Sequence, residues 1–248
     1  MQKPTISQIY GISLEVYKEN LFKMLAPMLI PTIFIVGVAL IFNLRALPSF
    51  EIKDISQYYS FSSYQALERI LGTWYEIFLV SIIAYVIFVL YAVCTTSGLI
   101  SDGLRRGSIS FDVGGRKGAT GFAFSLIPFA LVMLMTYYLA SQYGKYYVII
   151  PFLLGYLWNY TIASSVVDGA LIGKNMAVSM REVLRHPFFS AIIYVVPLAL
   201  VLAPTGGALY LCINYFPSYL FIITPIVIFL FIPYAVIVNT IGYLSLKL

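Results

Sequence analysis

The chain has 248 residues, of which 61% are hydrophobic and only 10% are charged, and its formal net charge is +5. Soluble domains contain about 45–50% apolar and about 25% charged residues, so this chain lacks the polar side chains that a water-exposed surface needs. The composition excludes a disordered tail, a collagen, a disulfide-stabilised secreted domain and a free-standing nucleic-acid binder. We therefore predict an integral membrane protein that contacts membrane lipids and no nucleic acid.

Residues 1–23 are predicted to form an amphipathic interfacial helix ahead of the membrane domain. Apolar residues between Ile6 and Leu21 recur at three- and four-residue steps, whereas Glu15, Lys18 and Glu19 fall on the other side. Such a helix either lies in the headgroup plane or packs on the bundle as a short connector. Charged residues also occupy the place of a signal peptide's apolar stretch, so no cleaved leader is expected.

Residues 24–248 are predicted to form a six-helix transmembrane domain. A hydrocarbon core of about 30 Å is crossed by about 20 apolar residues in a helix. The apolar runs of this length lie near residues 24–42, 74–96, 119–140, 147–167, 188–210 and 220–246. Apolar residues fill both alternating positions of each run, which argues against a membrane barrel, and only helices then satisfy their backbone within lipid. We therefore expect an all-α fold.

The lysines and arginines predict the orientation of the chain in the cell membrane. With the N-terminus in the cytoplasm, only four basic residues fall outside, namely Arg45, Lys53, Arg69 and Lys145. The other basic residues then lie on the cytoplasmic side, as the positive-inside rule requires. Six spans return the C-terminus to the cytoplasm as well.

The region between the first two spans is the only sizeable external segment. Residues 63–70 have the pattern of a short helix, and the residues around them are rich in tyrosine. This segment is interpreted as a lid, a docking surface or an aromatic belt anchor. Glu76 follows at the external end of the second span. Its carboxylate is either solvated at the interface or part of a gate or cation site.

The inner loop of residues 107–121, which follows the second span, is rich in glycine and contains Arg116 and Lys117. It does not match a phosphate-binding loop, because Arg116 precedes the lysine, Gly118 follows it, and no strand leads in. The basic side chains of the inner loops are instead predicted to contact lipid headgroups or a protein partner; they are Arg105, Arg106, Arg116, Lys117, Arg181 and Arg185.

Asp102 and Asp112 in the same region are the carboxylates available for a lipid-modifying metal enzyme of the CDP-alcohol phosphotransferase type. That chemistry needs several carboxylates around two metal ions, and the closing Asp-x-x-x-Asp pair is absent. We expect Asp102 to cap the end of its helix instead. No catalytic, cofactor-binding or metal-binding residue is predicted.

Polar and proline residues inside the spans are the candidates for a translocation path. Asn159 in the fourth span and Asn239 in the sixth are expected to hydrogen-bond between helices. The last two spans also contain two prolines each, and every one removes a helical hydrogen bond and bends its helix; they are Pro197, Pro204, Pro225 and Pro233. Such bends line substrate sites in transporters and also occur in purely structural bundles.

Cysteine and histidine content limits the chemistry further. The predicted topology places Cys94 at the inner end of its span and Cys212 at the outer end, too far apart for a disulfide, which needs Cα atoms within about 7 Å. His186 is the only histidine, so a bis-histidine haem or three-histidine zinc site is excluded within this chain.

An internal repeat is indicated by two inner loops that leave their spans through Asp102-Gly103 and Asp168-Gly169. Residues 14–21 also resemble 177–184, where a second amphipathic helix is predicted. We interpret the chain as three copies of an elbow helix followed by a helical hairpin, arranged as parallel repeats.

The opening stretch 12–31, with Tyr17-Lys18-Glu19-Asn20 before Lys23 and Pro27, resembles a prokaryotic six-helix family. So does the Asp168-Gly169-Ala170 turn before a helix that ends at Arg185-His186-Pro187. This family is related to the membrane domain of glycerophosphoryl diester phosphodiesterases. The resemblance implies six helices with elbow helices and no catalytic residues in this chain.

The function predicted from the sequence is that of a non-enzymatic membrane protein, a permease-like or scaffold subunit that works with a protein partner or as a homo-oligomer. An autonomous transporter or channel for a small or lipophilic solute is the first alternative. A lipid-modifying enzyme is the second.

Overall fold

The computed structural model describes residues 4–45, 74–143, 149–215 and 220–247. These residues are helical with short connections, and no strand occurs among them. The helices are α1 (Ile6–Glu19), α2 (Leu21–Arg45), α5 (Trp74–Arg106), α6 (Phe111–Tyr143), α7 (Ile149–Leu157), α8 (Thr161–Asp168), α9 (Lys174–Arg185), α10 (Pro187–Tyr215) and α11 (Leu220–Ser245). The predicted all-α class is confirmed for this part of the chain. The external segment 63–70 lies outside it.

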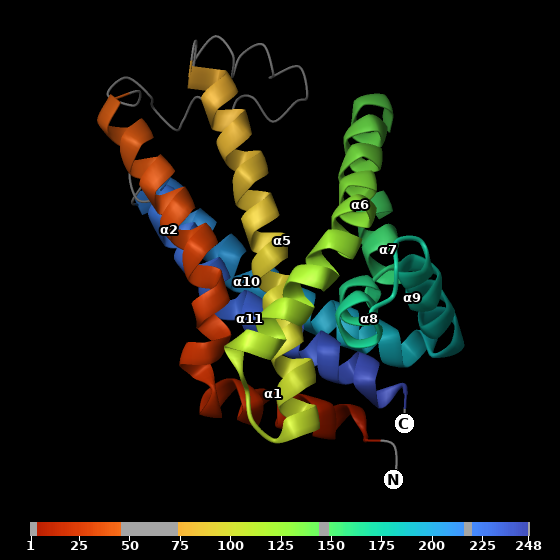
Figure 1. The fold of residues 1–248 in the computed structure, drawn as a ribbon. Helices are drawn as coiled ribbons and strands as arrows, with labels where there is room; N and C mark the ends of the chain where they lie inside the picture. The colour runs from red at the N-terminus through yellow and green to blue at the C-terminus, as the bar shows by residue number, and fades with distance from the viewer. Residues whose placement is uncertain (1–3, 46–73, 144–148, 216–219, 248) are drawn as a thin grey trace.

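Among the described residues, five helical segments are long and apolar enough to cross a bilayer, which is consistent with a multi-pass membrane protein. They are Leu21–Ile41, Val80–Arg106, Phe111–Met135, Pro187–Cys212 and Ile222–Ser245. In Figure 1, α2 and α5 rise side by side, α6 rises beside the lower half of α5 and then diverges, and α10 and α11 cross behind them at a tilt. Large apolar side chains of all five helices remain exposed, as expected for a surface that faces lipid.

The predicted fourth span is not one continuous helix, so a single helix over 147–167 is wrong. α7 ends at Leu157, a turn covers residues 158–160, and α8 begins at Thr161. Hydropathy does not reveal this break, because apolar residues continue on both sides of it. A sixth crossing is therefore not confirmed as one helix, and the segment takes the form of two short ones.

Residues 107–110 connect α5 to α6, whereas the glycine-rich residues 111–121 form the first turns of α6 and not a loop. An added Cβ at Gly98 of α5 would lie 2.2 Å from the carbonyl oxygen of Gly114, and one at Gly118 would lie 2.5 Å from the Cα of Thr95. The two backbones therefore touch along a stripe of small residues, the packing mode of many membrane helices. Gly121 continues the stripe toward Val166 of α8.

α1 packs across the end of the bundle, below the membrane helices in Figure 1. A capping box between Thr5 and Gln8 begins it. Its buried side carries Ile9 and Ser13, and the Tyr10 hydroxyl donates to the carbonyl of Ile192 at 3.0 Å. Burial, together with the nearby Tyr234, raises the pKa of Tyr10 to about 12, so this phenol remains a donor.

The second amphipathic helix, α9, faces inward with polar side chains. Asn175, Ser179 and Glu182 are buried together with the apolar Val183, whereas Met180 and Leu184 are exposed. A helix that packs on a protein core usually buries a mainly apolar stripe; here three of the four buried side chains are polar, and the contacts described below explain it. No third elbow helix occurs in the described residues, since α6 starts directly at Phe111.

Candidate ligand cavity at a broken helix

The break between α7 and α8 is stabilised by a serine from α9. Ser179 Oγ accepts from the backbone N–H of Tyr160 at 2.9 Å and donates to the carbonyl of Leu157 at 3.1 Å. The Tyr160 hydroxyl donates to Ser190 Oγ of α10 at 3.3 Å. Non-helical backbone within a bilayer is tolerated only where protein covers it or a cavity adjoins it. Here Tyr160 is fully buried, so α9 and α10 supply that cover.

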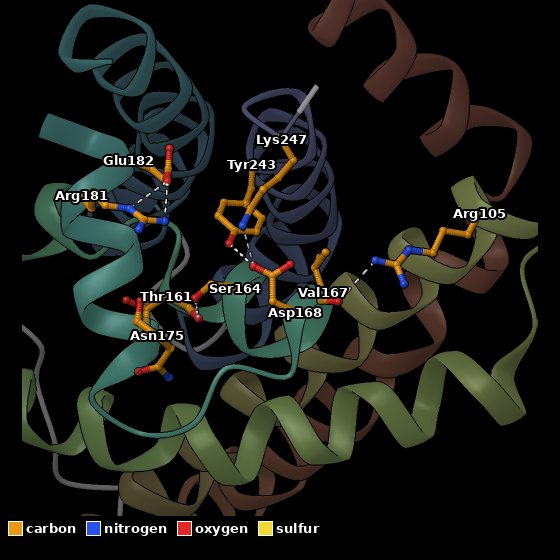
Figure 2. Close-up of polar contacts among 10 residues, drawn as sticks. All are labelled: Arg105, Thr161, Ser164, Val167, Asp168, Asn175, Arg181, Glu182, Tyr243 and Lys247. Carbon is orange, nitrogen blue, oxygen red and sulfur yellow. Dashed lines mark hydrogen bonds and ion pairs between the residues drawn. The ribbon is translucent and has the colours of Figure 1, made fainter. Parts of the chain in front are cut away.

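A hydrogen-bond network around Asn175 of α9 holds α8 in place (Figure 2). Ser164 Oγ donates to the carbonyls of Thr161 at 3.0 Å and Asn175 at 3.3 Å. The Asn175 side-chain amide donates in turn to Ser165 Oγ at 2.7 Å and to the carbonyl of Phe124 in α6 at 3.1 Å. These bonds explain why α9 turns its polar face inward.

The C-terminal end of α8 is bound to both α5 and α11. The Asp168 carboxylate accepts from the Tyr243 hydroxyl and from Lys247 Nζ, the latter at 2.9 Å, and Arg105 donates to the carbonyl of Val167 at 3.4 Å. Figure 2 shows these side chains converging on the end of α8 from two directions. Gly169 follows with φ +62°, a left-handed C-cap that suits glycine.

A cavity of about 300 Å³ adjoins the break and is lined by residues of α5, α8, α10 and α11. Asn159 lies in the break itself and accepts a hydrogen bond of 2.5 Å from the Asn239 side-chain amide. Ser97 and Thr240, whose hydroxyls lie 3.0 Å apart, form a second polar pair on the wall. The other lining residues are Val93, Ile162, Ala163, Ile193, Tyr194, Pro197, Leu198, Val201, Ile232, Ala235 and Val236.

The chemistry of this lining favours a small uncharged molecule. The wall contains no aspartate, glutamate, lysine or arginine, and an ion without a partner would pay a large desolvation penalty there. The Asn159 Nδ2 atom is buried and has no hydrogen-bond partner among the described residues. A buried donor without an acceptor is unfavourable, so a ligand with an acceptor group, such as a hydroxyl or carbonyl oxygen, would stabilise it.

The sequence prediction located part of this cavity. Asn159, Pro197 and Asn239 line it together. Each asparagine was expected to hydrogen-bond between helices, and in the structure the two bond to each other. Pro204, Pro225, Pro233 and Glu76 are not among its lining residues; both prolines of α11 are buried, and Glu76 is exposed in the first turn of α5.

Ser97 and Thr240 were missed, because lone hydroxyl residues within apolar spans also hydrogen-bond to their own helix. Thr240 does so as well, donating to the carbonyl of Val236 at 2.8 Å. Their sequence neighbours could have identified them, because each stands beside a second small or polar residue: Ser97 precedes Gly98, and Thr240 follows Asn239.

Asp102 does not cap its helix, because α5 continues to Arg106 and turns at Gly107, whose φ is +71°. Its buried carboxylate, with 1% of the side chain exposed, accepts from Arg106 Nε at 3.0 Å and from Lys117 Nζ at 3.3 Å. Asp112 is exposed and pairs with Arg116 at 3.1 Å. Each carboxylate predicted for a metal enzyme is thus held by cations of this chain.

The basic residues predicted to meet lipid or a partner are mostly engaged within the protein. Arg181 pairs with Glu182 at 3.1 Å, and the contacts of Arg105, Arg106, Arg116 and Lys117 are given above. Arg185 is exposed and forms no ion pair within the described residues. Both cysteines are free, as predicted.

Comparison with known proteins does not place the chain in a family. It matches no protein-family model, no curated protein and no solved structure.

Proposed function

We propose that this chain is a non-enzymatic, permease-like integral membrane protein that binds a small uncharged solute in the cavity at the α7–α8 break. The observation that carries the proposal is the position of Asn159. It lies in the interruption of a helix and lines a cavity of about 300 Å³, and its buried amide nitrogen Nδ2 has no acceptor among the described residues. Discontinuous helices of transporters use such positions to contact their substrate.

The surrounding helices suit a binding site that opens and closes. α10 and α11 each contain two prolines, and Pro197 lies on the cavity wall. A proline bend removes a backbone hydrogen bond and leaves the two halves of a helix free to pivot. The cavity has no buried carboxylate, so a passive path for a neutral solute is favoured over a proton-driven pump.

The proposed topology has six crossings, with α7 and α8 together as the fourth and both termini in the cytoplasm of the cell membrane. The end of α11 lies near the start of α1 at one end of the bundle (Figure 1), which supports ends on the same side. In the same view α6 ends near the top, whereas α8 and α9 lie lower. A crossing of the membrane by α7 and α8, from the end of α6 back to the level of α9, accounts for this arrangement.

Solute flux in proteoliposomes tests the proposal. Stopped-flow light scattering would follow urea, glycerol and 1,2-propanediol, with formate as a charged solute of similar size. We expect the protein to accelerate at least one of the neutral solutes and to leave formate at the rate of protein-free liposomes. Equal rates with and without protein for every neutral solute would contradict an autonomous path.

The proposal has two forms, an autonomous transporter and a subunit of a larger permease-like complex. Extraction from native membranes in mild detergent, followed by native mass spectrometry, separates them. A stoichiometric partner chain supports the subunit, whereas a monomer or homo-oligomer supports the autonomous form. The flux assay would then be repeated with the partner present.

A further inference from the structure

A second cavity, of about 440 Å³, lies where the α1–α2 junction meets the α5–α6 connection. Its lining comprises Val16, Glu19, Asn20, Lys23, Ile100, Gly103, Leu104, Gly107, Ser108 and Ile109. In Figure 1 this connection runs at the lower end of the bundle beside the junction of α1 and α2. None of its lining residues is shared with the cavity at the helix break.

The wall formed by the connection has a defined conformation. Gly107 turns the chain with φ +71°, and Gly103 allows Ile109 to fold back onto α5, since an added Cβ there would lie 2.5 Å from Ile109 Cγ1. The carbonyl of Ile109 then accepts from Lys23 Nζ at 3.2 Å. One ammonium group is thereby positioned on the cavity wall by a neutral partner.

The opposite charge lines the same cavity without neutralising this lysine. Glu19 and Lys23 are four residues apart, the spacing of an ion pair on one continuous helix. Asn20 ends α1 with φ −118° and ψ 26°, however, and α2 starts at Leu21. No ion pair joins Glu19 to Lys23 or to another basic residue of the described chain. The cavity therefore offers a carboxylate and an ammonium group to a ligand that carries both charges.

Apolar side chains complete the site on the side that faces lipid. Leu104 lines the cavity and is 47% exposed, and the neighbouring Leu21 and Phe22 are exposed as well. A charged head beside apolar surface is the chemistry of a membrane lipid at the interface. A soluble metabolite would gain nothing from these exposed apolar residues.

We propose that this cavity binds the headgroup of a membrane phospholipid that carries a phosphate diester and a primary ammonium group. Lys23 contacts the phosphate, and Glu19 contacts the ammonium group. Ser108 and Asn20 supply further polar groups on the wall, while the acyl chains lie against Leu104 and Phe22. The site is independent of the cavity at the helix break.

Native mass spectrometry of the full-length protein in detergent tests the site. Short-chain phosphatidylethanolamine, phosphatidylglycerol and phosphatidylcholine are added in turn, with free phosphoethanolamine as a soluble probe. Glu19→Gln and Lys23→Gln are compared with Lys18→Gln, a matched loss of charge on α1 outside the cavity lining. Each variant is first checked for an unchanged melting temperature.

We expect the wild type to prefer phosphatidylethanolamine. Lys23→Gln should weaken its binding about tenfold, the effect of losing one charge-assisted hydrogen bond. Glu19→Gln should abolish the preference over phosphatidylglycerol, and Lys18→Gln should change neither. Equal binding of all three lipids, or the same binding by wild type and both cavity variants, would overturn the site. Free phosphoethanolamine binding as tightly as the lipid would overturn the lipid as its occupant.

Discussion

Asn239 of α11 donates a 2.5 Å hydrogen bond to Asn159, which lies in the break between α7 and α8. The bond joins two residues 80 positions apart in sequence at the wall of a cavity. The bond links α11 to the α7–α8 break, and its two side-chain amides are polar groups of the proposed solute site.

The coupling between these two asparagines is directly measurable. In a double-mutant cycle with Asn159→Ala and Asn239→Ala, we expect an interaction energy of about 0.6–1.7 kcal/mol, as for other hydrogen bonds between membrane helices. Reversible unfolding in mixed micelles provides the free energies. Asn214→Ala is the control partner, because its side chain bonds within its own helix to Tyr210. Asn159→Ala is therefore combined with Asn239→Ala in one cycle and with Asn214→Ala in the other. If the unfolding free energies were additive in both cycles, the hydrogen bond between Asn159 and Asn239 would contribute nothing to stability and the prediction would be wrong.

The glycine stripe between α5 and α6 predicts opposite results at adjacent positions. An added Cβ at Gly114 would lie 2.8 Å from the Cα of Leu99, whereas one at Gly115 has nothing within 4 Å. Gly114→Ala should reduce the unfolding free energy by about 1–3 kcal/mol through overpacking. Gly115→Ala should leave it unchanged or raise it by up to about 1 kcal/mol. Equal losses at both positions would show that the backbones are not in contact.

Two aspartates of similar sequence context should differ in their effect on stability. Asp102 is 1% exposed and holds Arg106 and Lys117, whereas the Asp112 side chain is 70% exposed. Asp102→Asn should cost about 2 kcal/mol of unfolding free energy, because it leaves two cations without their buried partner. Asp112→Asn should change it by less than about 0.5 kcal/mol. The ranking is checked by parallel unfolding curves, and the reverse order would refute this role of Asp102.

The proposed orientation is checked by cysteine labelling on intact cells. Cys94 and Cys212 are buried, so an added cysteine gives the signal. A membrane-impermeant maleimide should react with Ser62→Cys on intact cells and with Ser108→Cys only after permeabilisation, since the positive-inside rule places Ser108 in the cytoplasm. The reverse labelling pattern would show that the chain has the opposite orientation in the membrane.

Length and hydropathy predicted most of the fold, because an apolar helix of about 20 residues is the only economical way through a bilayer. The break at residues 158–160 was not predictable in this way, since it depends on Ser179, a residue outside the span. The stripe at Gly114 and Gly118 was misinterpreted as a loop for a related reason. Glycine is typical of loops in water, yet in lipid it permits close helix contact.

The candidate site shows the same limit. Asn159, Pro197 and Asn239 were identifiable because polar and proline residues are rare within apolar spans. Their convergence on one cavity depends on how α8, α10 and α11 cross, which one sequence does not specify. The ion pairs of the basic residues could not be predicted for the same reason. Lys117, for example, reaches Asp102 only because α5 and α6 are in contact.

Blocking the cavity by one side chain tests the central claim most directly. Ala235 lines the cavity, whereas Ala203 on α10 is exposed and is not among its lining residues. Stopped-flow flux of the neutral solute carried by the wild type would be compared in Ala235→Phe and Ala203→Phe proteoliposomes. We predict that Ala235→Phe reduces the flux to the protein-free rate and that Ala203→Phe retains it. Wild-type flux in both variants would contradict a solute path through this cavity.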